Sequence, residues 1–312
     1  MKGQYEDARW WFQQGNSALR EKDIGHVVKL VLSFAAISVS HGTQPSRRKE
    51  SKKLYGLALS FALKAHSRVY RNMCLTDESV ELSLRGKFKE SFDLCSVAAR
   101  DCKNYNNDRL LESALKIMCY VCIIRGKVWK DHDAIQMFEA NASGKATSIA
   151  MAWLWKARGE RDKAVKHGLR AMNTSSFSRL LDIYDLWALG DIMKPGPDFL
   201  RVEERAKKFA DIMPIAQCIR LFITARRESY TGNRQRAIVY YRLAEKAAAS
   251  CELPYFKCMS WKALYNLGVD QLFPSIAIQE GVHSLRRFTS LRKQFFKTQK
   301  ELGFSGDLDE SK

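Results

Sequence analysis

The sequence predicts an all-α fold, namely an α-solenoid in which antiparallel helix pairs are stacked. Its composition is the first indication, because the 312 residues include only 17 glycines and 6 prolines and lack the alternation of polar and apolar residues typical of strands. Its periodicity is the second indication. Gly86, Gly159 and Gly232 are separated by equal intervals of 73 residues, from 86 to 159 and from 159 to 232.

Small residues recur five and twelve positions after each glycine: Ser91 and Ala98, Ala164 and Ala171, and Ala237 and Ala244. Glycine permits the positive φ of a tight turn between helices, and small residues allow the second helix to approach the first. One hairpin cannot bury such a face alone, so we expect the hairpins to stack. A softer turn at residues 195–197 divides the second interval and indicates hairpins of about 36–37 residues.

These glycine and alanine positions resemble the tetratricopeptide-repeat family. The resemblance covers three hairpins clearly and implies a right-handed superhelix that holds protein partners. The chain departs from the family in its longer period, since the family repeat has about 34 residues. The tryptophan, leucine and glycine of the family's first helix are mostly absent, as is the closing proline. The chain is therefore expected to be a divergent member of this group.

Other elements are predicted from breaks in the helical pattern. Residues 4–40 form an opening hairpin, and a polar loop over 41–53 leads into a helix that ends at Arg71. Asp108 is expected to cap a helix over 109–125. Further helices are predicted over 131–141 and 177–193, and Pro214 and Pro254 are expected to open others.

Three regions follow from this pattern. Residues 1–280 form the helical-hairpin solenoid with loop 41–53 inserted, 281–302 form a basic amphipathic C-terminal helix, and 303–312 form a disordered tail. The C-terminal helix is expected to cap the last repeat through Leu285, Phe288, Leu291 and Phe295. The alternative is a dedicated binding helix.

The resemblance also places a partner-binding surface. In the family, the first helix of each hairpin lines the concave face. Counting back from the turn glycines puts these residues on that face: Thr76, Val80 and Ser83; Ile149, Trp153 and Lys156; and Phe222, Arg226 and Tyr230. The last six are the predicted partner-binding residues. They suggest a protein segment with apolar anchors and some acidic residues, although the aromatic residues could equally pack between neighbouring helices.

No motif predicts catalysis, a cofactor or a metal. Cys119 and Cys122 form the only closely spaced cysteine pair, but a zinc site needs further ligands and this pair lies in an apolar helical run. The eight cysteines are instead predicted to be reduced core residues. The chain is therefore expected to be a non-enzymatic scaffold or adaptor.

The charge leaves a second interpretation open. The formal net charge is +18, and such a field attracts polyanions as well as acidic proteins. RNA or DNA binding is the alternative function, although no recognised nucleic-acid motif is present. The basic stretch Arg47–Lys53 fits either a nuclear-import signal or a solvated turn.

The N-terminal residues carry acids and no apolar signal region, and no apolar run is long enough to cross a bilayer. We therefore expect no membrane insertion and a cytoplasmic or nuclear location. The oligomeric state and the identity of the partner stay open.

Overall fold

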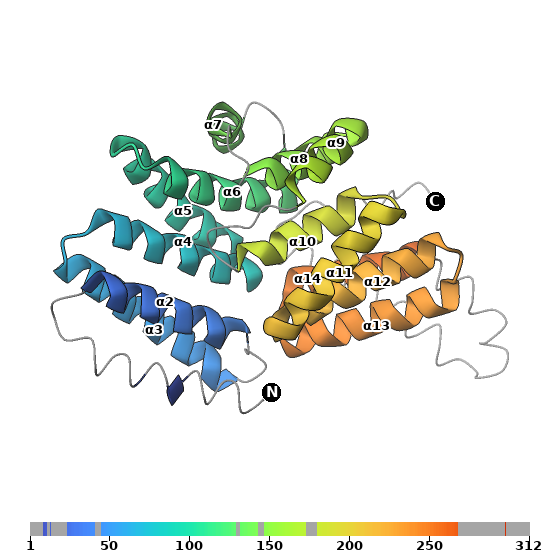
Figure 1. Cartoon of the computed structure of the whole chain (residues 1–312), viewed down its shortest axis with the longest axis horizontal. Helices are drawn as coiled ribbons and strands as arrows, with labels where there is room; N and C mark the ends of the chain where they lie inside the picture. The colour runs from blue at the N-terminus through green and yellow to red at the C-terminus, as the bar shows by residue number, and fades with distance from the viewer. Residues whose placement is uncertain are drawn as a thin grey trace.

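The computed structural model describes residues 9–10, 13, 24–40, 45–128, 132–142, 147–172, 180–267 and 297. All regular secondary structure within these residues is helical, which confirms the predicted all-α class. The helices of Figure 1 are α2 (Ile24–Ser40), α3 (Pro45–Lys64), α4 (Arg68–Leu84), α5 (Phe88–Asn104), α6 (Asp108–Ile124), α7 (Asp133–Asn141), α8 (Ser148–Ala157), α9 (Arg161–Ala171), α10 (Leu181–Ile192), α11 (Pro197–Ile212), the 3₁₀ helix η3 (Pro214–Ala216), α12 (Gln217–Tyr230), α13 (Arg234–Ser250) and α14 (Pro254–Asn266).

The three predicted turn glycines lie between helices, as expected. Gly86, Gly159 and Gly232 occupy the α4–α5, α8–α9 and α12–α13 turns with φ values of 77°, 86° and 80°. In the α8–α9 turn, the Gly159 amide donates to the Lys156 carbonyl and the next amide donates to the Trp155 carbonyl, both at 2.9 Å. This Schellman pattern satisfies the last carbonyls of the helix and needs a left-handed residue.

The same turn recurs at positions without glycine. His66, Asn106 and Glu252 have φ values of 50°, 54° and 51° in the α3–α4, α5–α6 and α13–α14 turns. His66 and Asn106 alternate along the chain with Gly86 and Gly126, which also have positive φ. Left-handed residues therefore occur every 20 residues, at 66, 86, 106 and 126. The first glycine interval therefore contains one long hairpin and one short hairpin, and 36–37 residues is only their mean length.

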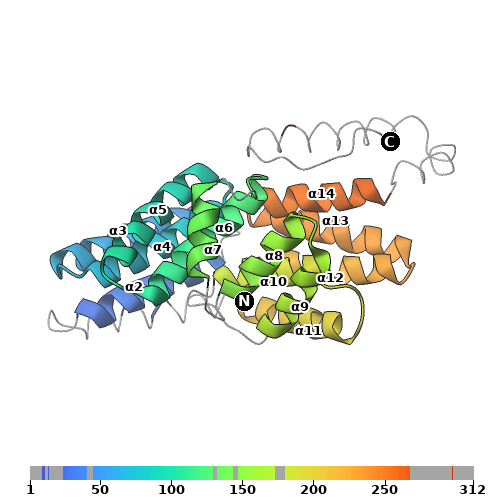
Figure 2. The same ribbon diagram turned by 90° about the horizontal axis from the view of Figure 1, so that it is seen from above.

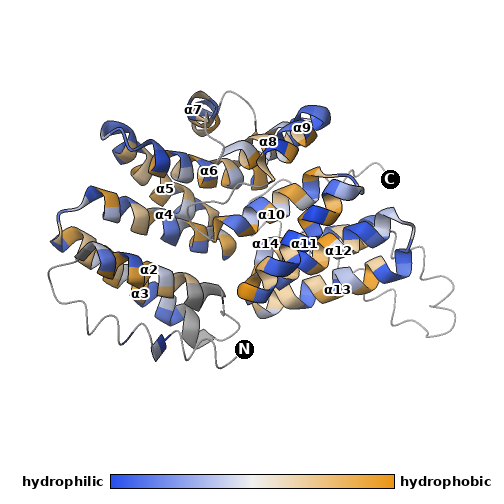
Figure 3. Cartoon of the chain, in the orientation of Figure 1, coloured by the Kyte–Doolittle hydropathy of each residue, from blue (hydrophilic) through white to orange (hydrophobic). Residues whose placement is uncertain are grey.

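Consecutive helices pack against one another in pairs, including α2 with α3, α4 with α5, α8 with α9, and α12 with α13. Figure 2 shows α2 to α5 at one end of the molecule and α12 to α14 at the other. Most helices carry both apolar and polar residues in Figure 3, as expected when one face is buried. The predicted contact residues Ala164, Ala171, Ala237 and Ala244 are at most 1% exposed, which confirms their burial.

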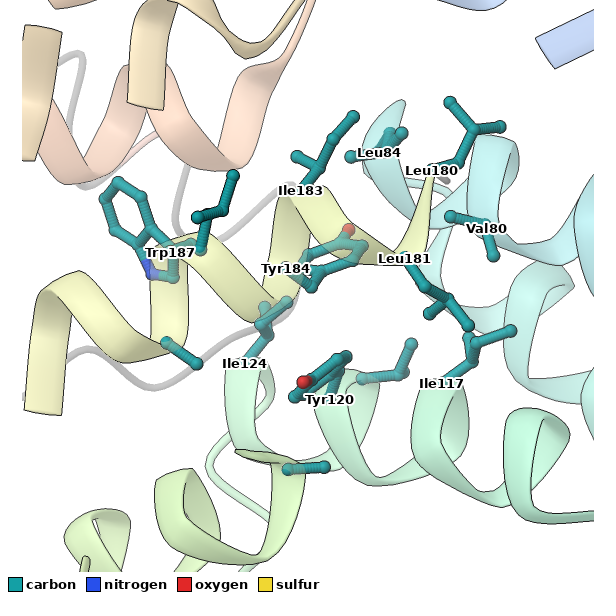
Figure 4. Close-up of a cluster of buried hydrophobic side chains, with 14 of the residues drawn as sticks. Val80, Leu84, Ile117, Tyr120, Ile124, Leu180, Leu181, Ile183, Tyr184 and Trp187 are labelled. Carbon is teal, nitrogen blue, oxygen red and sulfur yellow. The ribbon is translucent and has the colours of Figure 1, made fainter. Parts of the chain in front are cut away.

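Helix α10 lies at the centre of the packing. Every residue of this helix except Asp191 is buried. It packs against α8, α9, α11 and α12, and Figure 4 shows its residues Leu181 and Tyr184 among side chains of α4 and α6. A helix that is apolar on all sides must be surrounded by other helices, and α10 meets this condition.

Three aspartates interrupt the apolar sequence of α10, and each meets a cation from another helix. Asp185 lies 2.7 Å from Lys116 of α6, and Asp182 lies 3.8 Å from Arg205 of α11. Asp191 pairs with Lys156 of α8 and Arg226 of α12. Because a buried charge is costly unless it is paired, these contacts fix the position of α10 among its neighbours.

The α4–α5 turn contacts the α13–α14 turn, although 166 residues separate the two contact positions. Arg85 donates to the Cys251 carbonyl, and the rings of Phe88 and Tyr255 meet edge to face at 6.5 Å. Nearby, Tyr184 of α10 donates to Ser83 Oγ at 3.1 Å. In a simple linear array each repeat contacts only its neighbours, so this chain adds a long-range contact that such an array lacks.

Three predicted local features are wrong. The helix expected to end at Arg71 ends at Lys64, and Arg71 belongs to α4, which begins at Arg68. The loop predicted over 41–53 is helical from Pro45 onward, because α3 begins there; the basic stretch Arg47–Lys53 therefore belongs to a helix. A proline at the first helical position is compatible with this start. The α6 cap is Asn107, whose side chain accepts from the Leu110 amide, and Asp108 is the first helical residue.

The predictions for the C-terminal helix 281–302 and the tail 303–312 lie outside the described residues, apart from position 297. The prediction of buried cysteines is confirmed, because all eight cysteines lie in the described part of the chain, are buried and form no disulfide. No helix in the described part of the chain combines the length and apolar character needed to cross a membrane.

Candidate partner-binding hollow

The structure brings most of the six predicted partner-binding residues into one region. Trp153 and Lys156 lie on α8, and Phe222, Arg226 and Tyr230 lie on α12. Lys156 and Arg226 both pair with Asp191, the last aspartate of α10. Two hairpins distant in sequence therefore meet at the end of the central helix.

The predicted residues differ in exposure. Ile149 has no exposed surface, and Trp153 and Phe222 are 4% and 7% exposed, so these three contribute mainly to packing. Tyr230 is 46% exposed, and the side chains of Lys156 and Arg226 are 27% and 13% exposed. The first-hairpin residues predicted for the same face (Thr76, Val80 and Ser83) are all buried, so that part of the face prediction is wrong. Their helix α4 packs against α2, α3, α5 and α6, which leaves these positions in the core.

Asp191 organises the polar contacts of this region. Its carboxylate accepts from Trp153 Nε1 at 3.0 Å and from Arg226 Nη1 at 3.1 Å, and it also accepts from Lys156 Nζ. Arg226 donates in addition to the Gly190 carbonyl at 2.5 Å and to Tyr230 Oη at 3.0 Å. The guanidinium thus connects α10 to α12 through several donors, as its fork geometry allows.

The neighbouring charges shift the pKa values of the cluster. Burial acts to raise the pKa of Asp191, but Lys156 and Arg226 outweigh it and hold the pKa below its ordinary value. Burial lowers the pKa of Lys156; Asp191 opposes this shift, and Arg226 reinforces it. Burial acts to raise the pKa of Tyr230, but Arg226 and Arg161 together hold it below its ordinary value. Asp191 is therefore ionised at neutral pH and shared between two cations.

Beside this cluster lies a hollow of about 420 Å³, which we call the basic hollow. Its lining consists of Lys156, Asp191, Phe222, Arg226, Ser229, Tyr241, Met259, Lys262, Ala263, Asn266 and Leu267. Three cations therefore face one carboxylate. Lys262 has no carboxylate partner within the described ranges, and the wall beside it is apolar. The basic hollow can accept a further anionic group with an apolar neighbour.

Of the eleven lining residues, the sequence predicted only Lys156, Phe222 and Arg226; the eight that it missed include Asp191, Lys262 and Asn266. Asp191 carries a signal, because it is a charged residue near the end of the otherwise apolar run Leu186–Ile192. Such a residue needs a partner when buried. Lys262 and Asn266 carry no comparable signal, since their role depends on how α14 packs beside α12.

The closely spaced Cys119 and Cys122 lie in α6 and are buried. Burial raises the pKa of the Cys122 thiol to about 12, so this thiol is protonated at neutral pH. Among the described residues, His, Cys, Asp and Glu side chains form no group of three or more able to hold a metal ion. These cysteines pack as the sequence predicted.

The chain matches no protein-family model and no curated protein sequence.

Proposed function

We propose that the protein is a non-enzymatic interaction scaffold that holds an acidic segment of a partner protein in the basic hollow. Its helix pairs would form a divergent superhelix of the tetratricopeptide type. Left-handed residues in successive turns, with pairwise packing of consecutive helices, support this part of the proposal. A cytoplasmic or nuclear location agrees with eight buried cysteines that form no disulfide.

The observation that carries the proposal is the charge imbalance of the basic hollow. Lys156 and Arg226 already share Asp191, and Lys262 adds a third positive charge. An acidic side chain entering the hollow would face Lys262 and the outer sides of the shared cations. Partly enclosed cations interact with such a group more strongly than fully solvated ones do.

The apolar wall defines the rest of the partner segment. Phe222, Met259 and Leu267 line the hollow beside the cations. A volume of about 420 Å³ suits one or two side chains and not a whole helix. The expected recognition element is therefore one acidic residue next to an apolar anchor.

The test begins with selection from a displayed library of short random peptides on the full-length, nuclease-treated protein. Enriched peptides should combine an acidic residue with a neighbouring apolar residue. Binding of one such labelled peptide is then measured by fluorescence anisotropy for wild type, Lys262→Glu and Lys246→Glu. Lys246 is exposed on α13 and does not line the hollow, so it provides a control with the same change of charge.

Lys262→Glu should weaken peptide binding about tenfold or more, and Lys246→Glu should change it little. Equal effects of the two variants, or peptides without acidic residues, would contradict the proposal. The nucleic-acid alternative is tested with a labelled single-stranded RNA at low and at physiological salt. Tight RNA binding that falls steeply with salt and is indifferent to Lys262→Glu would favour that alternative.

A further inference from the structure

A second concavity lies away from the basic hollow, between the α4–α5 hairpin and the α13–α14 turn. Its volume is about 980 Å³, and we call it the acidic groove. Its lining consists of Lys52, Glu78, Glu81, Leu82, Arg85, Lys87, Glu90, Asp93, Leu94, Val97, Ala248, Ala249, Glu252, Leu253, Pro254 and Lys257. The groove thus forms where the two distant turns of the chain meet.

The charge of this groove differs from that of the whole chain. Five acidic residues and four basic residues line it, whereas the chain has 34 acidic and 52 basic residues. Lys87 lies 3.0 Å from Glu90, and Arg85 donates to the Cys251 carbonyl on the opposite wall. Lys257 lies over the Trp261 ring at 4.7 Å. Three of the four cations are therefore already engaged by groups of the protein itself.

Two of the five acidic side chains, Asp93 and Glu78, keep the capacity to meet further cations. Asp93 is exposed and has no ion-pair partner in the portion of the chain that the structure describes. Glu78 is half-buried in the groove; burial raises its pKa, and Lys52 opposes this shift. An additional cation near Glu78 would stabilise its ionised form.

The wall of the groove is apolar and helical. Leu94 and Val97 are one turn apart on α5, and Val97 is 42% exposed. Leu253 and Pro254 lie across from them at the start of α14. Residues three positions apart form the ridge that receives the side chains of another helix. The volume corresponds to about two turns of a helix of ordinary diameter.

We propose that the acidic groove is a second interaction surface, which receives a basic amphipathic helix of a partner protein. Leucine or phenylalanine side chains on one face of that helix contact Leu94 and Val97. Lysine or arginine side chains on its other positions meet Asp93 and Glu78. The positive field of the rest of the chain repels basic partners, so this local reversal of charge directs them to one surface.

The test uses two labelled amphipathic peptides that share leucine and phenylalanine positions. One carries lysine at all polar positions, and its twin carries glutamate there. Fluorescence anisotropy with the full-length protein should show binding of the lysine peptide and much weaker binding of the twin. A double variant, Glu90→Lys with Asp93→Lys, should weaken binding of the lysine peptide about tenfold.

The matched control is Glu204→Lys with Asp211→Lys. These residues are exposed on α11, which contributes nothing to the groove, and the change of net charge is the same. Equal losses in the two double variants, or equal binding of both peptides, would overturn the proposal.

Val97→Ser should also weaken binding, since it removes an apolar contact without altering charge. Thermal melting of every variant shows whether folding is preserved, and a Val97→Ser protein that folds and binds normally would contradict the proposed helix contact.

The groove could instead be filled by this protein itself. Carbodiimide cross-linking of the unliganded full-length protein, followed by mass spectrometry, detects links from Asp93 or Glu90 to lysines. Links to lysines of residues 281–302, or to a second copy in an isotopically mixed sample, would overturn the partner proposal. This surface is independent of the basic hollow, because failure of the acidic peptides there does not affect binding of the lysine peptide here.

Discussion

Two aspartates of the same helix, α10, meet their cations in contrasting ways. Asp185 pairs with Lys116 at 2.7 Å, and the two side chains are 1% and 2% exposed. Tyr120 also donates to Asp185. Asp191, one and a half turns later, is 24% exposed and is shared by Lys156 and Arg226 beside a hollow that also contains Lys262.

This difference distinguishes an ion pair that only stabilises the fold from a charged cluster that can also bind a ligand. The Lys116–Asp185 pair is buried away from solvent and has one positive charge for one negative charge, so it has no capacity for another ligand. The Asp191 cluster has two cations for one carboxylate and reaches solvent through the basic hollow. Charge excess together with access, and not the presence of an ion pair alone, indicates which site can bind a partner.

The largest effect on stability should come from breaking the buried Lys116–Asp185 pair. Lys116→Met removes the buried ammonium and leaves the Asp185 carboxylate in an apolar environment. We expect the free energy of unfolding to fall by about 3–5 kcal/mol. Urea unfolding followed by circular dichroism measures this loss.

A double variant sharpens this result. Lys116→Met with Asp185→Leu removes both charges, and much of the lost stability should return, because an apolar pair needs no compensation. A Lys116→Met protein as stable as wild type would show that this pair does not hold α6 against α10. Binding of acidic peptides should be unchanged in any variant of this pair that folds.

Much of the fold could be predicted from the sequence, because its signals are local. A glycine that needs positive φ identifies a turn wherever it occurs, as at Gly159. The turns at His66 and Asn106 have the same backbone geometry but no glycine, so no residue type revealed the spacing of 20. Loop 41–53 was mispredicted because its polar residues suit both a loop and an exposed helix face.

The candidate site could be predicted only in part, for a physical reason. Lys156 and Arg226 were identified because they lie at helical spacing from turn glycines. Asp191 and Lys262 come from helices α10 and α14, whose placement depends on long-range packing. Ile149 was predicted for the same face but is fully buried, because helical spacing shows which residues share a face and not which part of that face other helices cover.

The next largest effect on stability concerns the close packing of α10 against α12 beside the Asp191 cluster. A Cβ atom added at Gly190 would lie 2.7 Å from Ile223 Cγ1. Gly190→Ala should therefore force the helices apart and lower the free energy of unfolding by about 1–3 kcal/mol. Because the Gly190 carbonyl accepts from Arg226, acidic-peptide binding should weaken as well.

Thermal unfolding and peptide anisotropy measure these two quantities for Gly190→Ala. Gly56→Ala is the control, since a Cβ atom there meets nothing within 4 Å. Equal stability of the two variants would show that α10 and α12 have room to adjust. In that case the hollow is less rigid than its contacts suggest.

Asp191→Asn should have a smaller effect on stability and an opposite effect on binding. The substitution removes the shared carboxylate charge, but the cluster reaches solvent, so the loss should be about 1–2 kcal/mol. Lys156 and Arg226 are then free to attract an acidic peptide, and its affinity should rise. A drop in affinity together with stability would mean that Asp191 only holds the site in shape.

The smallest effect is the pH dependence of the same cluster. The folded-state pKa of Asp191 lies below the ordinary value of 3.8, because Lys156 and Arg226 outweigh the effect of burial. A carboxyl group with a lowered pKa adds stability that is fully present above its unfolded pKa and is lost as pH falls through its folded pKa. The stability difference between wild type and Asp191→Asn should therefore be constant near neutral pH and shrink only below about pH 3.8. Urea unfolding of both proteins across this range measures it. A difference that persists unchanged at the lowest pH would show that the Asp191 charge is not what stabilises the fold, and the contrast with Asp185 would then rest on packing alone.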